Sequence, residues 1–187
     1  LGRIRYNYDE KYFADFSYRR DGSSRFAKDA RWGDFYSFGL NWNAKKENFL
    51  QGVEWLNDLR VRASYGEVGN NAGVSLYAYQ SLYEINKNGG NAAFISQSLP
   101  APNIKWETTQ TVDLGIEGKL FDRLNFSFGY FDKRSKDLLF EVRLPYSAGS
   151  YPHNDSMTNW SIYQNIGTIS NRGFEIALSG EIIKNKD

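Results

Sequence analysis

Apolar and polar residues alternate with a period of two through most of the chain, and this pattern limits the possible folds more than any other feature. Segment 32–44 shows it most clearly, with its apolar side chains at Tyr36, Phe38, Leu40 and Trp42. Successive side chains of a β-strand point to opposite faces of a sheet. The alternation therefore predicts a strand with one apolar face and one polar face.

The same pattern predicts seven strands. They cover residues 2–8, 12–19, 32–44, 59–66, 111–117, 124–130 and 174–182. One more short strand is expected within 138–144, and 47–58 has room for a single helical turn, which Gly52 weakens. The predicted fold class is all-β, an antiparallel up-and-down meander of about seven or eight strands.

The connections between these strands differ in length: in order they are short, longer, medium, very long, short and very long. In chain order they cover 9–11, 20–31, 45–58, 67–108, 119–123 and 134–172. A meander sends alternate connections to opposite ends of its sheet, so one end is predicted to carry compact turns and the other end all the large loops. Outer-membrane β-barrels have this asymmetry, with their long loops outside the cell.

Two environments could cover the apolar faces. In a soluble β-sandwich a second sheet covers them, whereas in a transmembrane barrel lipid does. Segment 32–44 exceeds the usual strand length of about 5–6 residues, and about 9–11 residues cross a bilayer. Tyr6, Tyr12 and Trp42 lie near predicted strand ends, where barrels have an aromatic girdle. These features favour the barrel.

The polar faces carry charges of both signs, which suits a wide, wet or plugged lumen. Arg60 and Arg62 share one face of their strand, and Asp113 and Glu117 share one face of the next. We expect these four side chains to face the lumen, where they could form salt bridges or contact a plug. A solvated charged wall is the alternative.

The composition argues against several function classes. Lys and Arg number 23 against 22 Asp and Glu, and a net charge of +1 gives no field for binding nucleic acid. The chain has no cysteine and one histidine, His153, so a cysteine site, a histidine-based triad or a multi-histidine zinc site is not expected. No catalytic residue, metal site or cofactor is predicted, and an enzyme ranks below the binding functions.

Several short segments, taken in order, resemble the SusC/RagA-like TonB-dependent outer-membrane transporters of Gram-negative bacteria. Each is weakly specific alone, but together they span nearly the whole chain. They are 18–26 with 31–33, 59–66 with 68–70, 102–107 with 109–110, 130–132 with 136–139, and 165–167 with 171–175. One departure is Tyr36 after Phe35, where the family often has proline.

The resemblance implies that 1–187 is a segment of a barrel domain of the 22-stranded class, with the plug domain and the remaining strands absent. It also implies active import of glycan oligosaccharides or peptides across the outer membrane, with the barrel in contact with outer-membrane lipid. The implied partners are a SusD-like lipoprotein lid and, through the absent plug, the TonB complex. A soluble β-sandwich that binds carbohydrate stays open as the alternative.

Aromatic residues in the two longest loops are the candidate contacts for ligand or lid. They are Tyr77, Tyr79, Tyr83 and Trp106 in the first loop, and Tyr151, Trp160 and Tyr163 in the second. Flat, weakly polar rings can stack on sugars or pack against a protein partner. Packing of these rings within the loops themselves is the alternative for each of them.

Overall fold

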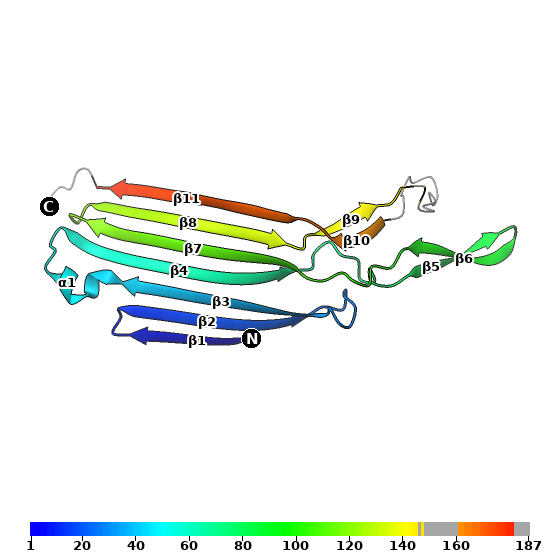
Figure 1. Ribbon diagram of the computed structural model, residues 1–187, viewed down its shortest axis with the longest axis horizontal. Coiled ribbons are helices and arrows are strands. Elements are labelled where there is room, and N and C mark those ends of the chain that lie inside the picture. The colour runs from blue at the N-terminus through cyan, green and yellow to red at the C-terminus, as the bar shows by residue number, and fades with distance from the viewer. Residues whose placement is uncertain (146, 148–160, 182–187) are drawn as a thin grey trace.

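The computed structural model describes residues 1–145, 147 and 161–181, and its main element is one seven-stranded antiparallel sheet (Figure 1). Its strands, in spatial order, are β1 (Gly2–Tyr8), β2 (Tyr12–Gly22), β3 (Trp32–Asn43), β4 (Leu56–Asn70), β7 (Glu107–Leu120), β8 (Leu124–Lys136) and β11 (Thr168–Gly180). Each strand pairs with the strands of this sheet that come before and after it in the sequence. The prediction of an all-β meander is confirmed.

Smaller elements lie in the connections. Two hairpins pair β5 (Leu82–Asn88) with β6 (Asn91–Ser98), and β9 (Leu139–Arg143) with β10 (Ser161–Asn165). Between β3 and β4 the chain forms a 3-10 turn, Ala44–Lys46, and the short helix α1, Asn48–Gln51. No helix in the described part of the chain is long and apolar enough to cross a membrane.

The connections divide between the two ends of the sheet as the sequence predicts (Figure 1). The short-turn end carries the turns after β1 and β7 and the helical connection after β3. The loop end carries the connections after β2, β4 and β8, which hold both hairpins. The two longest connections, after β4 and β8, therefore both lie at the loop end, although the helical connection after β3 is longer than the loop after β2.

Each strand from β2 to β11 in the large sheet presents four apolar, aromatic or small residues to the same face, and we call this set the apolar band. Its members are Tyr12, Ala14, Phe16 and Tyr18; Tyr36, Phe38, Leu40 and Trp42; Leu59, Val61, Ala63 and Tyr65; Val112, Leu114, Ile116 and Gly118; Leu124, Phe126, Phe128 and Tyr130; and Phe174, Ile176, Leu178 and Gly180. Leu40 is 45% exposed and Ile176 71%. No described layer of protein covers this face.

The apolar band slants across the strands. Tyr36 forms its loop-side edge on β3, but on β4 the edge residue Tyr65 pairs with Phe38, one step nearer the short-turn end. On β8 the edge residue Tyr130 pairs with Leu114, a further step down. A drop of about 6.8 Å along the strand for each ~9.6 Å across the sheet corresponds to a tilt of about 35°. A flat apolar slab that crosses tilted strands produces this pattern.

The strands continue beyond the apolar band toward the loop end, so several strand ends expected from the sequence were wrong. β2 reaches Gly22 rather than 19, β4 reaches Asn70, and β11 begins at Thr168 rather than 174. Beyond the band the outward face carries polar residues, as in the pair Arg20 and Asp34. The alternation therefore disappears while the backbone pairing continues.

A hydrogen-bonded clamp fixes the band to the polar connection at the short-turn end. The Tyr12 hydroxyl and the Trp42 indole N–H both donate to Oε1 of Glu47, the latter at 3.3 Å. These two bonds, with the Tyr12 bond as the larger cause, hold the pKa of Glu47 below its ordinary value. The aromatic rings at this edge thus have their polar atoms tied to the solvent side, as in an interfacial girdle.

We expect Leu40→Arg in the complete barrel to lower the free energy of unfolding in lipid by about 2–4 kcal/mol, since Leu40 lies within the band. Asn41→Arg, on the opposite face of the same strand, should have a much smaller effect. Denaturant titration of the barrel in lipid vesicles measures both. Equal losses for the two variants would contradict a lipid-facing band.

Candidate functional site at the loop end

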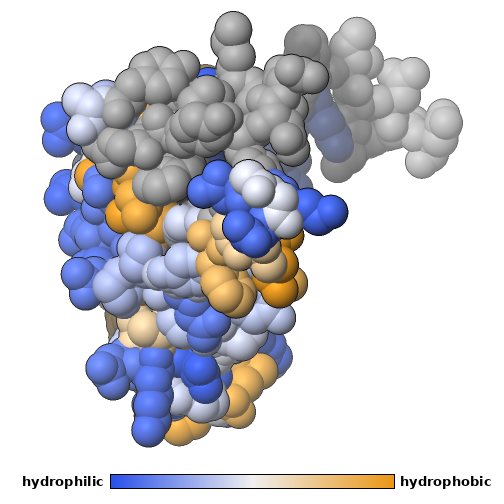
Figure 2. Space-filling model, turned by 90° about the vertical axis from the view of Figure 1, so that its right-hand side faces the viewer, coloured by the Kyte–Doolittle hydropathy of each residue, from blue (hydrophilic) through white to orange (hydrophobic). Residues whose placement is uncertain are grey.

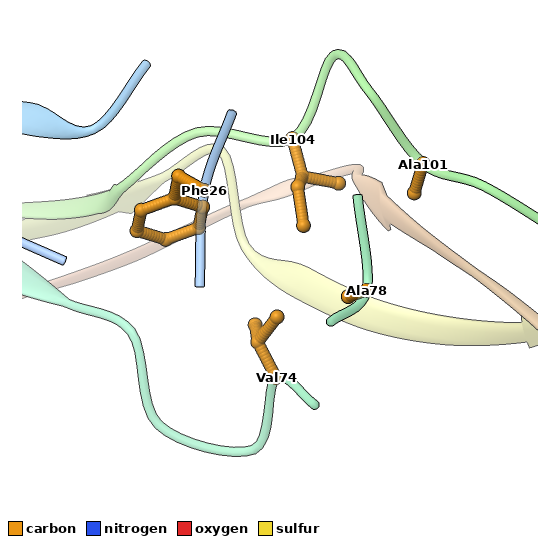
Figure 3. Packing of buried hydrophobic residues seen from close by; sticks show 5 residues of the cluster. All are labelled: Phe26, Val74, Ala78, Ala101 and Ile104. Atoms are coloured by element: carbon orange, nitrogen blue, oxygen red, sulfur yellow. The ribbon is translucent and has the colours of Figure 1, made fainter. Parts of the chain in front are cut away.

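The buried apolar core of the described chain lies in the loops rather than under the sheet. Phe26 is fully buried and packs with Val74, Ala78, Ala101 and Ile104, which point toward one another (Figure 3). These residues come from the β2–β3 connection and from both halves of the β4–β7 connection. We call this set the loop core. It joins two loops that are far apart in the sequence into one packed unit.

Trp106 and the residues after β8 extend the loop core. The Trp106 ring lies 5.3 Å from the Phe26 ring and 5.6 Å from the Phe35 ring, between centroids. Its indole N–H donates to the carbonyl oxygen of Arg31 at 3.2 Å. Ile162 and Tyr163, both of β10, pack against the same core. All three loop-end connections therefore meet at one place.

Asn165 connects two of these loops through its side chain alone. Its Oδ1 accepts from the backbone N–H of Lys105 at 2.8 Å, and its Nδ2 donates to the carbonyls of Lys105 and Asp137 at 2.9 and 2.8 Å. The Lys105 ammonium also lies 2.9 Å from the Asp137 carboxylate. These contacts fix the segment that leads into β7 against the start of the β8–β11 connection.

Arg25 connects the other pair of segments. Its Nη1 donates to the carbonyl oxygens of Val74 and Asn71 at 2.8 and 3.3 Å, and the Asn71 side chain donates to Oγ of Ser23 at 2.9 Å. Several of the short segments that carry the family resemblance contribute residues to these loop contacts, namely 18–26, 31–33, 102–107, 136–139 and 165–167.

A groove of about 440 Å³ opens beside this network. Its walls are the segment 100–105, Asp137 and the residues 162–166 of β10 and its end. Of the predicted contact residues that the structure describes, Tyr163 alone lines it. The groove offers apolar surface beside the Lys105–Asp137 ion pair.

The other predicted contact residues have different surroundings. Tyr77 and Tyr83 are exposed, whereas the hydroxyl of Tyr79 accepts a hydrogen bond from the Gln80 amide at 2.8 Å. Trp106 is packed in the loop core, the alternative that the sequence left open. Tyr151 and Trp160 lie outside the described residues.

The β5–β6 hairpin was not predicted, and it extends from the sheet beyond the other loops (Figure 1). One of its faces carries Tyr83, Ile85 and Phe94, which are 63%, 72% and 78% exposed; we call them the hairpin patch. Ile85 and Phe94 are directly opposite across the two strands. The alternation in 82–88 is short and broken by polar residues, so it gave a weak signal in the sequence.

The face opposite the apolar band is polar, and in the end-on view of Figure 2 hydrophilic residues gather on one side of the sheet and hydrophobic residues on the other. A basin of about 670 Å³ there is lined by charged side chains that include Arg3, Asp15, Arg62 and Asp113. A Cβ atom on Gly115 would lie 2.5 Å from Nε of Arg62, so this glycine lets the guanidinium lie flat across the sheet.

The predicted lumen charges all lie on this polar face. Arg60 is opposite Glu117 in the register, but its ion pair, at 3.1 Å, is with Asp58 on its own strand. Ser64 donates to Asp113 at 3.5 Å. Within the described residues, Arg62, Asp113 and Glu117 form no ion pair. Their charges are therefore available to a further element.

Three features together define the wall of an outer-membrane barrel. They are the uncovered apolar band of the meander, the packed loop end and the charged opposite face. The chain belongs to the family described as TonB dependent receptor-like, beta-barrel, whose model matches residues 2–183. This membership places the chain in the outer membrane of a Gram-negative bacterium, as the sequence predicts.

Individual relatives show which members of the family the chain resembles. The chain is 36% identical to TonB-dependent receptor SusC of Bacteroides thetaiotaomicron and 36% identical to TonB-dependent receptor P3 of Formosa agariphila, over its full length in both cases. Among solved structures it resembles the RagAB peptide importer in its closed-closed and open-open states, with TM-scores of 0.82 and 0.81 and 32% identity, over 99% of this chain.

The chain spans only part of these proteins. It covers 18% of the Formosa receptor, 19% of SusC and 20% of the matched chain of the closed-closed importer. Substrate, lid and energy coupling are properties of a complete transporter, and for this chain they are matters of proposal.

We expect Phe26→Ala in the complete transporter to destabilise the loop end by about 3–5 kcal/mol, because it leaves a cavity in the loop core. Hydrogen exchange of the backbone amides in 71–80 and 99–106 should accelerate, while the amides of β2 and β3 stay protected. Phe49→Ala is the matched control, since that ring is exposed in α1. Unchanged exchange in the loops would contradict a stabilising loop core.

Proposed function

We propose that the chain forms part of the wall and outer rim of an active transporter that imports bulky nutrients through the outer membrane. The observation that supports this most is the joining of all three loop-end connections, beyond the slanted apolar band, into a packed rim. A rim of this kind can hold a fixed vestibule at the mouth of a wide barrel. The remaining strands and the plug would lie elsewhere in the complete protein.

The proposed chemistry is binding and passage without covalent steps. The relatives are named as receptors and importers rather than as enzymes. The competing carbohydrate-binding sandwich requires a second sheet over the apolar band. In the described part of the chain, the only other sheets are the two hairpins of the loop end.

The cargo is proposed to be an oligosaccharide or a peptide. SusC and the RagAB peptide importer are both among the similar proteins. The groove beside Tyr163 combines an aromatic ring, apolar surface and the ion pair of Lys105 with Asp137. Aromatic rings can stack on sugar faces, and the ion pair offers charged groups that can bind a peptide backbone or termini.

The hairpin patch is the proposed contact for a SusD-like lipoprotein lid. Its three apolar side chains are exposed on an element that projects beyond the rim. Apolar and aromatic residues clustered on a projecting surface are typical of protein contacts. This proposal retains two of the predicted contacts, Tyr83 within the patch and Tyr77, which precedes the hairpin in the same connection.

The polar face is proposed to contact the plug through which the TonB complex acts. Arg62 and Asp113 line the basin without ion pairs in the described chain, and Arg60 and Glu117 lie in the adjoining rows. Fixed charges of both signs can position a folded plug in a wet lumen by complementary pairing.

An uptake experiment tests both the transport and the plug contact. A strain lacking the complete transporter should lose uptake of labelled oligosaccharides or of labelled oligopeptides, and the wild-type gene should restore it. Arg62→Glu should restore less than half of that uptake, because its reversed charge repels the plug's complementary groups. Arg123→Glu, in the β7–β8 turn, is the matched control and should restore it fully.

The outcomes separate the two ideas. If the deletion affects neither class of ligand, the import function is wrong. If Arg62→Glu restores full uptake, the import function stands and the plug contact is wrong. Surface expression and the heat-dependent gel mobility of each variant establish that the barrel has assembled.

The lid contact has its own test. Ile85→Ser combined with Phe94→Ser should lower the amount of lipoprotein that copurifies with the complete transporter by about tenfold, since two desolvated apolar anchors are lost. Phe121→Ser, at a largely exposed ring (66%) of the short-turn end, should leave it unchanged. Undiminished copurification in the double variant would exclude the hairpin patch as the lid contact.

A further inference from the structure

One edge of β10 pairs with no described strand, and the groove of about 440 Å³ runs along it. In its two-stranded sheet β10 pairs with β9 at its other edge. The groove is lined by the five consecutive residues 162–166 and by no residue of β9. Because successive side chains of a strand point to opposite faces, this unbroken run indicates that the groove follows the edge of β10 rather than one of its faces.

The hydrogen bonds of the β9–β10 hairpin show which backbone groups lie on this edge. In an antiparallel pair, opposite residues alternate between those that exchange both backbone hydrogen bonds and those that exchange none. The N–H of Ile166 donates to the carbonyl oxygen of Leu138 at 2.8 Å, in register with the ladder. The even-numbered residues of β10 therefore bond to β9, and the backbone N–H and C=O groups of Tyr163 and Asn165 point away from it.

Segment 100–105, across the groove, does not pair with this edge as a third strand. Two of its six residues are proline, which has no backbone N–H. The N–H groups of Ala101 and Ile104 donate to carbonyl oxygens of the loop core, and that of Lys105 donates to the Asn165 side chain. This wall therefore keeps few donors for the edge of β10, and the groove stays open.

One end of the groove is closed and carries charge. The Asn165 carboxamide joins the backbones of Lys105 and Asp137 there. The ammonium of Lys105 lies 2.9 Å from the carboxylate of Asp137, with side chains that are 55% and 41% exposed. An ion pair this exposed contributes little stability, so either member can bind a charged ligand group instead.

We propose that the groove binds an extended peptide, which adds to β10 as a third strand through backbone hydrogen bonds. The peptide is one of the two cargo classes of the proposed import function, on which this binding mode rests. An unpaired strand edge is complementary to a chain whose N–H and C=O groups repeat about every 6.6–6.8 Å along one side. A peptide has this repeat, and an oligosaccharide does not.

The length and ends of the groove fit a short peptide segment. Four residue steps along 162–166 span about 13 Å, which corresponds to about four or five extended peptide residues. A charged terminus at the closed end would lie beside Lys105 or Asp137 and could form a charge-assisted hydrogen bond with it. Strand addition uses the ligand's backbone for affinity, so peptides of many sequences should bind.

The test uses the complete transporter in detergent, with a tryptic digest of casein as the probe and native mass spectrometry as the readout. Tyr163→Pro removes the N–H on the open edge and should weaken peptide binding about tenfold. Glu141→Pro is the matched control. Glu141 is opposite Tyr163 in the register, so its N–H points away from β10 on the far edge of the same hairpin, and binding should be unchanged. Tyr163→Ala keeps the N–H and should weaken binding less than threefold.

A second measurement changes the ligand and leaves the protein intact. One casein peptide that binds is synthesised with a single N-methyl group on each backbone amide in turn. In an added strand only every second amide faces β10. N-methylation should therefore weaken binding about tenfold at alternate positions within the bound segment and have little effect at the positions between them.

Several results would overturn the strand addition. They are unchanged binding by Tyr163→Pro, equal losses in the two proline variants, and equal effects of N-methylation at successive amides. Slow exchange of the Gln164 amide, which is bonded to β9, establishes that the hairpin is intact; if a proline variant loses this protection, the N-methylated peptides decide. Loss of copurified lipoprotein with peptide binding retained in Tyr163→Pro would assign the edge to the lid, and the proposal would be wrong.

The import function and the strand addition fail separately. If the deletion strain loses uptake of oligosaccharides alone and no casein peptide binds, import stands and the strand addition is wrong. If casein peptides bind with the alternating pattern but the deletion strain keeps its uptake of both ligand classes, the groove binds peptide and the import function is wrong.

Discussion

Contact between the apolar band and lipid hydrocarbon is the interaction on which the rest of the structure depends. The large sheet has no protein core on either face, because one face is apolar and uncovered and the other is charged and hollowed. In water such a sheet would expose a continuous apolar surface far larger than soluble monomers show. In a bilayer the same surface is satisfied, and the tilt of about 35° that the band implies lies within the range of outer-membrane barrels.

This constraint explains why the only buried core of the described chain lies at the loop end. Lipid can stabilise the wall, but it cannot order segments that extend into water. Phe26 and its neighbours order the loops by ordinary packing, and Asn165 and Arg25 add hydrogen bonds from side chain to backbone. The chain therefore has two separate sources of stability, which are lipid contact along the strands and apolar packing at the loop end.

The parts of the fold that could be predicted from the sequence are those that lipid determines. The alternation located all seven strands of the sheet and the asymmetry of the connections. It failed where the chain leaves the lipid, at the loop-side ends of β2, β4 and β11 and at β5, β6 and β10. There both faces meet water or other loops, so Arg20 and Asp34 can pair across strands without any apolar signal.

The candidate site shows the same division. Aromatic type alone could not separate Trp106, which is packed in the loop core, from Tyr83, which is exposed on the hairpin. That distinction depends on contacts between segments distant in sequence, such as the 5.3 Å approach of the Phe26 and Trp106 rings. Ile85 and Phe94 were missed because their pairing exists only once the hairpin has formed.

The position of the loop core has a consequence for how such a protein can diversify. The β5–β6 hairpin is attached to the wall only through segments that pass the loop core, at Ala78 on the way out and Ala101 on the return, where the two backbones are hydrogen-bonded at 2.9 Å. That hydrogen bond closes the β4–β7 connection between the hairpin and the wall. Insertions or exchanges beyond it can alter what the rim recognises, while the machinery that inserts the barrel still meets an unchanged surface.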